Sequence, residues 1–121
     1  MAYTVLVIFC VAASWTHALW VWAAAILCGQ PFLRLYLMAE HGRCPFVDDM
    51  FKNTRTVFTN PLVRLVAWNM PFHAEHHAYP NIPYFNLPAF HEIVKNNLKV
   101  TSNGYTEFHR ETMSAVKTNS Q

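Results

Sequence analysis

The sequence predicts a mainly α-helical protein whose N-terminal part is embedded in a membrane. Residues 1–33 contain no Asp, Glu, Lys or Arg, so all nine basic and seven acidic residues lie from Arg34 onward. No alternating run of apolar and polar residues is long enough to predict a sheet. We therefore expect a single domain with a membrane-embedded helical segment over 1–40 and a cytosolic, histidine-rich region with further helices over 41–121.

The apolar stretch over 2–28 is long enough to cross a lipid bilayer. As one helix it would measure about 40 Å, which exceeds the roughly 30 Å of the hydrocarbon layer. It is a poor match to a signal peptide, because no basic residue precedes it and its apolar run is too long. Trp15, Trp20 and Trp22 are of the residue type that gathers at membrane interfaces.

Two arrangements of this segment fit the sequence. One is a single long span, and the other is the tail of one helix, a turn near 14–16 and a second helix over 17–40. We favour the second arrangement, because the apolar pattern continues past Gly29 and reaches the charged region with a natural helix length. Pro31 would then kink the second helix rather than end it. His17 would lie at the polar turn, or would serve a function inside the membrane.

Charge and cysteine content exclude two common classes of protein. The net charge of +2 is too small to indicate a nucleic-acid partner. Three widely spaced cysteines without a C-x-x-C motif do not indicate a disulfide framework. Basic residues follow the apolar segment, and the positive-inside tendency places that end in the cytoplasm. These residues are Arg34, Arg43, Lys52, Arg55 and Arg64.

The region after the apolar segment reads as a series of short elements. We expect a loop with one short turn over 48–60. Asn60 and Pro61 are typical of a helix N-cap and first helical position. Pro71 should kink or restart that helix just before the histidines.

Two further helices are expected towards the C-terminus. Asn86 can cap one of them, with Pro88 in its first turn. The other is expected over 105–116, and 117–121 are expected to fray.

Three histidines with the pattern H-x-x-H-H form the strongest motif in the sequence. His73, His76 and His77 would share one face of a helix within an arc of about 100°, with Glu75 nearly opposite. Random placement of seven histidines would give this pattern only about 0.02 times per chain. Imidazole is a good ligand for iron, zinc, copper and nickel. The pattern therefore favours a metal site over a solvated histidine patch.

Zinc hydrolase motifs do not fit this order of residues. The H-E-x-x-H motif needs Glu at position 74, which is Ala, and H-x-x-E-H needs Glu at position 76, which is His. Three histidines with an open position could still bind zinc, but Glu75 points away as a general base. Adjacent His76 and His77 diverge by about 100° on a helix. Such neighbours more easily serve two metal ions than one.

The stretch NMPFHAEHHAYPNIPYFNLPAFHEIVK, over 69–95, resembles the third histidine box of the membrane fatty acid desaturase and hydroxylase superfamily. In that superfamily H-x-x-H-H is followed by aromatic–Pro, Pro–aromatic and Leu–Pro segments, which are present here. QPFLRLYLMAEHGRCP and NTRTVFTNPLVRLVAWN are similar to the stretch ahead of that box, and YTEFHRE to the C-terminal tail. The resemblance covers nearly the whole chain from about residue 16.

The resemblance implies a helical membrane protein with a cytosolic cap that holds two irons. The irons activate dioxygen, electrons come from a ferredoxin or a cytochrome b5-type protein, and the substrate is a lipid acyl chain. By the same resemblance, His73, His76, His77 and His41 would be iron ligands. Glu40 and Asn69 could orient ligand imidazoles through the second ring nitrogen, or be solvated surface residues. No side chain is expected to act directly on substrate, and His91 and His109 are expected not to be ligands.

The chain departs from the superfamily pattern in one respect, because the first two histidine boxes are not in it. Four plausible ligands cannot complete a two-iron site, so we expect a C-terminal fragment that is inactive alone. Acyl desaturation is favoured over carotenoid or alkane hydroxylation and ketolation by the sequence that flanks the box. A small, non-catalytic, membrane-anchored metal-binding protein is the remaining alternative, and a membrane zinc hydrolase ranks last.

Overall fold

The computed structural model describes residues 1–119, and it confirms a mainly α-helical protein. The described residues form two compact units, 1–35 and 36–121, the second described as far as residue 119. The boundary lies inside a helix, about one and a half turns before the division that we expected after residue 40. It lies there because the last turns of that helix contact the histidine-rich region.

The first unit is a helical hairpin, as the favoured arrangement of the apolar segment predicts. Helix α1 covers Ala2–Ala12, and helix α2 begins at Thr16 and continues to His41 in the second unit. Ser14 takes a left-handed conformation with φ of 58°, and the N–H of Trp15 donates to the carbonyl of Cys10 at 2.7 Å. Helix α2 passes through Pro31 without ending there.

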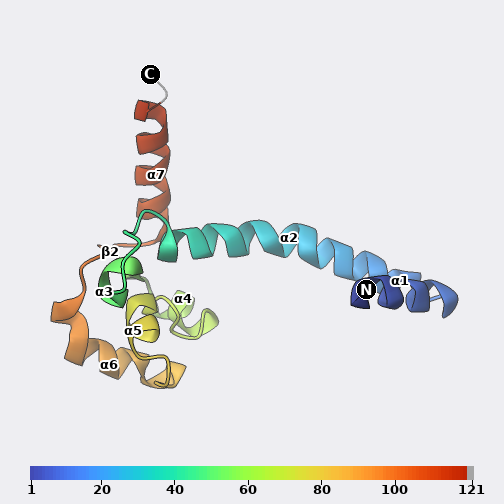
Figure 1. The fold of residues 1–121 in the computed structure, drawn as a ribbon, viewed down its shortest axis with the longest axis horizontal. Helices are drawn as coiled ribbons and strands as arrows, with labels where there is room; N and C mark the ends of the chain where they lie inside the picture. Colours follow the sequence, from blue (N-terminus) through green and yellow to red (C-terminus); the bar gives the residue numbers. More distant parts are fainter. Residues whose placement is uncertain (120–121) are drawn as a thin grey trace. The chain divides into compact units, whose positions relative to one another are not determined.

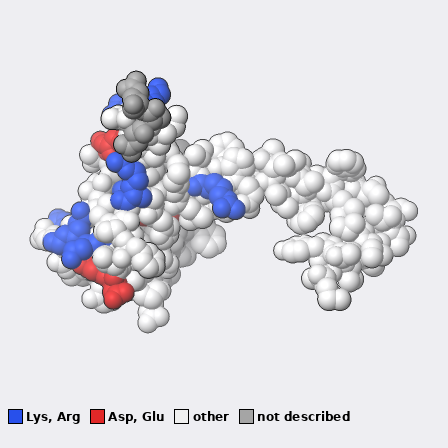
Figure 2. Space-filling model, turned by 45° about the horizontal axis from the view of Figure 1, so that its top comes forward, with Lys and Arg blue, Asp and Glu red and all other residues white. Residues whose placement is uncertain are grey.

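Helix α2 is the element that could cross a membrane. Its 26 residues include an 18-residue window with a mean hydropathy of 1.4, none of which is buried inside the protein. Exposed side chains such as Trp20, Leu27 and Phe32 need an apolar solvent, because water around a stripe of this size is unfavourable. Within the first unit Arg34 is the only charged side chain. The other charged residues belong to the second unit, and Figure 2 shows basic residues in blue and acidic residues in red. By its length and composition, α2 could therefore cross a membrane.

The second unit consists of short helices around a two-stranded bridge (Figure 1). Its elements are α3 (Met50–Asn53), β1 (Thr56–Val57), α4 (Pro61–Val66), α5 (His73–Ala78), η1 (Tyr84–Asn86), α6 (Leu87–Val94), η2 (Lys95–Asn97), β2 (Thr101–Ser102) and α7 (Tyr105–Asn119).

Two predicted helix starts have different outcomes. Asn60 caps α4, because its side-chain oxygen accepts from the N–H of Val63 at 2.9 Å, and Pro61 is the first helical residue. The prediction that the Asn86 side chain caps α6 is wrong. Asn86 is itself in the 3₁₀ turn η1 with helical φ and ψ, so its side chain makes no cap hydrogen bond. A preceding helical turn supplies the start of α6 instead.

The C-terminal helix α7 is longer than predicted. It begins at Tyr105 as expected but continues to Asn119, so the fraying expected from residue 117 is not found as far as 119. Residues 120 and 121 lie outside the described part of the chain.

The short parallel pairing of β1 with β2 was not predicted from the sequence. Thr56 pairs with Thr101 and Val57 with Ser102, and the N–H of Phe58 donates to the carbonyl of Ser102 at 2.8 Å. Two-residue strands are too short to leave an alternating pattern. They form here because tertiary packing brings residues 45 positions apart together.

Helix α5 lies at the centre of the second unit, where it contacts α3, α6 and β1 (Figure 1). The core around it is small, and its buried apolar side chains include Val57, Phe72, Ala74, Leu87, Val94 and Phe108. Arg55 joins this core to the end of α2. Its guanidinium Nη1 donates to the carbonyls of Ala39 at 2.6 Å and Gly42 at 2.9 Å, and the group lies 4.5 Å from the ring centre of Phe108. This contact fixes the C-terminal end of α2 against the histidine-rich region.

Candidate metal centre

Three histidine rings converge on one point in the second unit. His41 is the last residue of α2, and His73 and His77 lie on α5. The Nε2 atom of His73 lies 2.8 Å from that of His41 and 3.0 Å from that of His77. All three ligand atoms lie within 4.8 Å of one another.

This geometry fits a single metal ion. Two nitrogens that bind one ion at about 2.1 Å and at right angles lie about 3.0 Å apart. The separations of 2.8 and 3.0 Å match that spacing. Three imidazoles are also a donor set suited to iron, zinc, copper or nickel. His41, His73 and His77 are therefore the residues that would hold a metal here.

Helical spacing and a tight loop together place two of these ligands. His73 and His77 are four residues apart, so they share one face of α5. Trp68 and Asn69, just before α5, take left-handed conformations with φ of 53° and 56°. These two residues reverse the chain between α4 and α5. The sequence predicts the shared face but contains no glycine that would mark the reversal.

Burial favours the neutral form of the His73 and His77 rings, which is the form that binds a metal ion. Burial, together with the neighbouring rings of His77, His41 and His76, lowers the pKa of His73 from its usual 6.5 to about 3. Burial also lowers the pKa of His77, and the neighbouring histidines lower this pKa as well. Metal ligation requires the neutral imidazole, so both environments favour the form that binds.

His76 is not part of this three-nitrogen cluster. Its ring centre lies 6.2 Å from that of His73 and 5.7 Å from that of His77. Its Nδ1 atom is buried and has no hydrogen-bond partner. A ring nitrogen in that condition keeps its capacity to bind a metal, and this fits the expectation that the adjacent histidines serve two ions. The role of His76 as a ligand stays a prediction.

Glu40 lies beside the ring of His73. Its carboxylate is fully buried, and Oε2 lies 3.4 Å from Nδ1 of His73, the nitrogen that does not face the cluster. Neither of these two atoms has a hydrogen-bond partner among residues 1–119, so the orienting role of Glu40 stays a prediction. The hydroxyl of Tyr105 donates to Oε1 of Glu40 at 3.2 Å. Burial raises the pKa of Tyr105, so this hydroxyl stays protonated and able to donate.

Sequence reasoning missed Tyr105, which follows Glu40 by 65 positions. Its ring also stacks on that of Tyr36, with the ring centres 5.1 Å apart. No local signal could have found it, because the contact depends on α7 packing beside the end of α2. The quoted tail motif YTEFHRE starts at this residue.

Asn69 contacts a different part of the chain. Its side-chain amide donates to the carbonyl of Tyr84 in η1 at 3.1 Å. This bond joins the reversal before α5 to the proline-rich segment after it. Its expected role beside a ligand imidazole stays a prediction, since its side chain donates to a backbone carbonyl and not to an imidazole.

Glu75 lies on the opposite face of α5 from the cluster, as its position in the sequence predicts. Its carboxylate is fully buried and accepts from the hydroxyl of Thr56, while His91 lies on its other oxygen. Among residues 1–119, neither His91 nor His109 joins the group of three histidines. Glu75 is therefore occupied and not free to act as a general base.

Comparison with known proteins agrees with the motif. The family model described as fatty acid desaturase matches residues 1–109. Neither a curated protein nor a solved structure is significantly similar to the chain. The match covers most of the sequence, including the membrane-length helix, the histidine box and the segment that follows it. On this evidence the chain belongs to the fatty acid desaturase family.

Proposed function

We propose that this chain provides part of the iron centre of an integral-membrane fatty acid desaturase, which introduces a double bond into a lipid acyl chain. The convergence of the Nε2 atoms of His41, His73 and His77 carries the proposal. Membership of the family supplies the reaction class, and the position of His41 at the end of the apolar helix α2 suits a lipid substrate. The histidine box would face the cytoplasm, where the basic residues after α2 are expected.

Removal of hydrogen from an unactivated C–H bond is beyond any amino-acid side chain. Bound iron, with dioxygen and electrons from a ferredoxin or cytochrome b5-type protein, would supply that oxidising capacity. The side chains of this protein would bind the iron and orient its ligands. His41, His73 and His77 would present their Nε2 atoms to the ion, and Glu40, with Oε2 3.4 Å from Nδ1 of His73, would orient the His73 ring.

A two-iron site needs more ligands than these four histidines. His76, with its buried and unpartnered Nδ1, is the residue here best placed to serve a second ion. The remaining ligands would come from residues other than those described, in keeping with the histidine boxes that the chain does not contain. We propose that the 121 residues alone do not catalyse the reaction.

Iron content tests the proposal. The complete reading frame is expressed, purified in detergent and analysed for iron, beside a His73→Ala, His77→Ala variant. We expect about two irons per chain, lost in the variant. A protein that folds but contains no iron would contradict the proposal, and stoichiometric zinc without iron would favour a hydrolase.

Product analysis then separates the members of the superfamily. Membrane lipids of a host that expresses the iron-loaded protein are analysed for new double bonds. New unsaturated acyl chains support a desaturase. Oxygenated carotenoids or alkanols with unchanged fatty acids would instead assign a hydroxylase or ketolase, and no product with bound metal would favour a non-catalytic metal-binding protein.

A further inference from the structure

We propose that Glu75 and His91 are positioning residues for the metal centre. A buried chain of hydrogen bonds, Thr56–Glu75–His91, fixes the rotation of α5 about its axis and thereby the aim of His73 and His77. We call these three residues the α5 brace. The inference rests on the proposed metal-binding function, but it concerns residues that touch neither the metal ligands nor the substrate.

The brace uses both oxygens of one buried carboxylate. Oε2 of Glu75 accepts from the Thr56 hydroxyl at 2.5 Å, and Oε1 lies 2.5 Å from Nδ1 of His91. Thr56 lies on β1 and His91 on α6, so the carboxylate joins α5 to two other elements. Glu75 and Thr56 are fully buried, and His91 is 9% exposed. Both contacts are buried, so breaking either one leaves a buried polar group without a partner.

Helix α5 needs such a brace because it is short. It has six residues, and Phe72 at its N-cap makes no side-chain cap hydrogen bond. Isolated helices shorter than about 12 residues are unstable in water, so tertiary contacts must hold this one. Glu75 is two residues from both His73 and His77, so it projects about 160° away from each of them around the helix axis. Its bonds therefore act on the face directly behind the ligands.

The distance of the ligand nitrogens from the axis of α5 makes metal binding sensitive to the contacts of Glu75. A ring nitrogen lies about 7 Å from the helix axis, so a roll of about 10° displaces it by about 1 Å. Metal sites tolerate only about 0.2 Å in ligand distance. A small rotation of α5 would therefore move His73 and His77 out of range of an ion that His41 holds.

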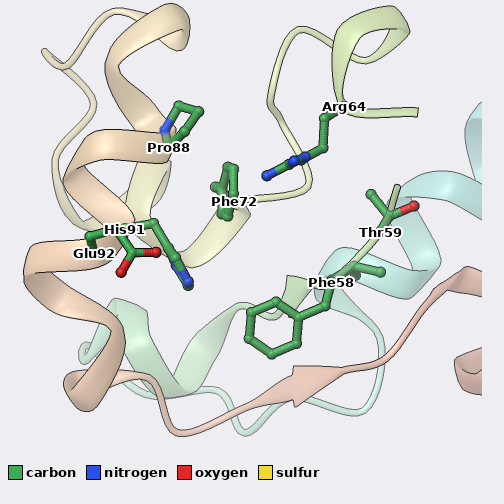
Figure 3. A pocket seen from close by; sticks show the side chains of 8 residues that line it. Phe58, Thr59, Arg64, Phe72, Pro88, His91 and Glu92 are labelled. Carbon is green, nitrogen blue, oxygen red and sulfur yellow. The ribbon is translucent and has the colours of Figure 1, made fainter. Parts of the chain in front are cut away.

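His91 is itself held firmly. Its ring centre lies 4.8 Å from that of Phe72 and 5.8 Å from that of Phe58, and Figure 3 shows the imidazole reaching from α6 towards these rings. His91 also lines a cavity of about 230 Å³ with Arg64 and Pro88. Because the cavity adjoins the ring, a smaller side chain at position 91 can be tolerated with added water.

Cobalt binding to the full chain in detergent tests the brace, because Co²⁺ bound to histidine has a visible spectrum that reports ligand geometry. The variants are Glu75→Gln, His91→Phe, which keeps a ring but removes the donor, and His91→Asn, which restores an N–H near Nδ1. Glu92→Gln is the matched control, since the Glu92 side chain is exposed and its carboxylate pairs with Lys95 at 2.7 Å.

We expect Glu75→Gln and His91→Phe to weaken Co²⁺ binding about 10- to 100-fold and to change the spectrum, as loss of supporting bonds does in other metal sites. His91→Asn should recover most of the affinity, and Glu92→Gln should match the unmodified chain. Folded variants whose Co²⁺ affinity stays within about twofold of the unmodified chain would overturn the brace. Equal weakening by Glu92→Gln would overturn it as well.

Amide hydrogen exchange without metal separates this inference from the proposed function. An unmodified chain that binds no Co²⁺ contradicts the metal centre, and the brace is then judged by exchange alone. Glu75→Gln and His91→Phe should speed exchange in α5 relative to α7, and Glu92→Gln should not. Unchanged exchange in α5 would overturn the brace. If Glu75→Gln fails to fold, the brace is tested by comparing the Co²⁺ affinity and the α5 exchange rates of His91→Phe with those of His91→Asn.

Discussion

The Nε2 atoms of His41 and His73 lie 2.8 Å apart, although 32 positions separate the two residues. One ring comes from the last residue of a membrane-length helix and the other from a six-residue helix in the core of the second unit. The two nitrogens can share a hydrogen bond if one of the rings carries its proton on Nε2, or both can bind one cation. The proposed metal centre places a cation between these nitrogens, and the predictions on metal affinity depend on it.

Removal of one cluster histidine should remove tight metal binding. We expect His73→Ala or His77→Ala to weaken binding of the first Co²⁺ or Fe²⁺ ion at least about 100-fold, since two remaining nitrogens bind far less tightly than three. His109→Ala is the control, because His109 lies outside the cluster. Metal titration followed by absorption gives the affinities. Equal affinities in all variants would place the metal elsewhere.

Glycine is required at position 42 because of space rather than backbone conformation. A Cβ there would lie 2.4 Å from the carbonyl oxygen of Met38 and 3.3 Å from Cζ of Phe108. We expect Gly42→Ala to destabilise the second unit by about 2 kcal/mol and to disturb the adjacent ligand His41. Gly29→Ala is the matched control, because nothing lies within 4 Å of its Cβ. Thermal unfolding in detergent compares the two, and equal effects would contradict the steric explanation.

Arg55 should couple the end of α2 to the metal centre. Its Nη1 serves the carbonyls of Ala39 and Gly42, and its backbone N–H donates to the carbonyl of Glu40 at 2.8 Å. We expect Arg55→Met to cost about 2–3 kcal/mol, because partly buried carbonyls lose a charged donor. Metal affinity should fall together with stability, since His41 is in the same turn.

The exposed Arg110 on α7 provides the control for Arg55. Arg110→Met removes the same charge and should leave unfolding and metal affinity within error. Denaturant titrations in detergent, with and without Co²⁺, measure both quantities. If Arg55→Met changes stability but not metal affinity, the coupling to His41 is wrong.

Acid should destabilise the metal-free protein. Burial holds the pKa of His73 at about 3 in the folded chain, against about 6.5 in an unfolded chain. The unfolded chain therefore binds more protons between these values. The stability that His73 contributes is fully present above about pH 6.5 and is lost as the pH falls towards about 3. Burial raises the pKa of Glu40 to about 7, and its protonation has the opposite sign down to its usual value of 4.5. We therefore expect the unfolding temperature to fall below about pH 4.5, and bound metal to be released as the pH falls.

His73→Asn tests the origin of that pH dependence. The variant lacks the titrating group, so its unfolding temperature should fall less steeply with acid than that of the unmodified chain. Scans of both proteins at several pH values, without metal, provide the comparison. Equal slopes would assign the acid sensitivity to another group.

The sequence by itself determined the local features of this protein. The uncharged first 33 residues predicted the helical hairpin and membrane-length helix, and Asn60 with Pro61 predicted the start of α4. The i, i+4 spacing put His73 and His77 on one face, with Glu75 behind them. The box and its flanks also led to the family. Such features follow from neighbours within a turn or two, whose relative positions the helix geometry fixes.

Only the tertiary structure decided which side chains meet across longer distances. It brought His41 to the cluster while His76 lay to one side, and it placed Tyr105 on Glu40. It also joined Thr56, Glu75 and His91 and paired β1 with β2. Contacts between residues 16 to 65 positions apart depend on how every intervening turn and short helix packs. No periodicity in the sequence records that packing, because each short element takes its orientation from the others.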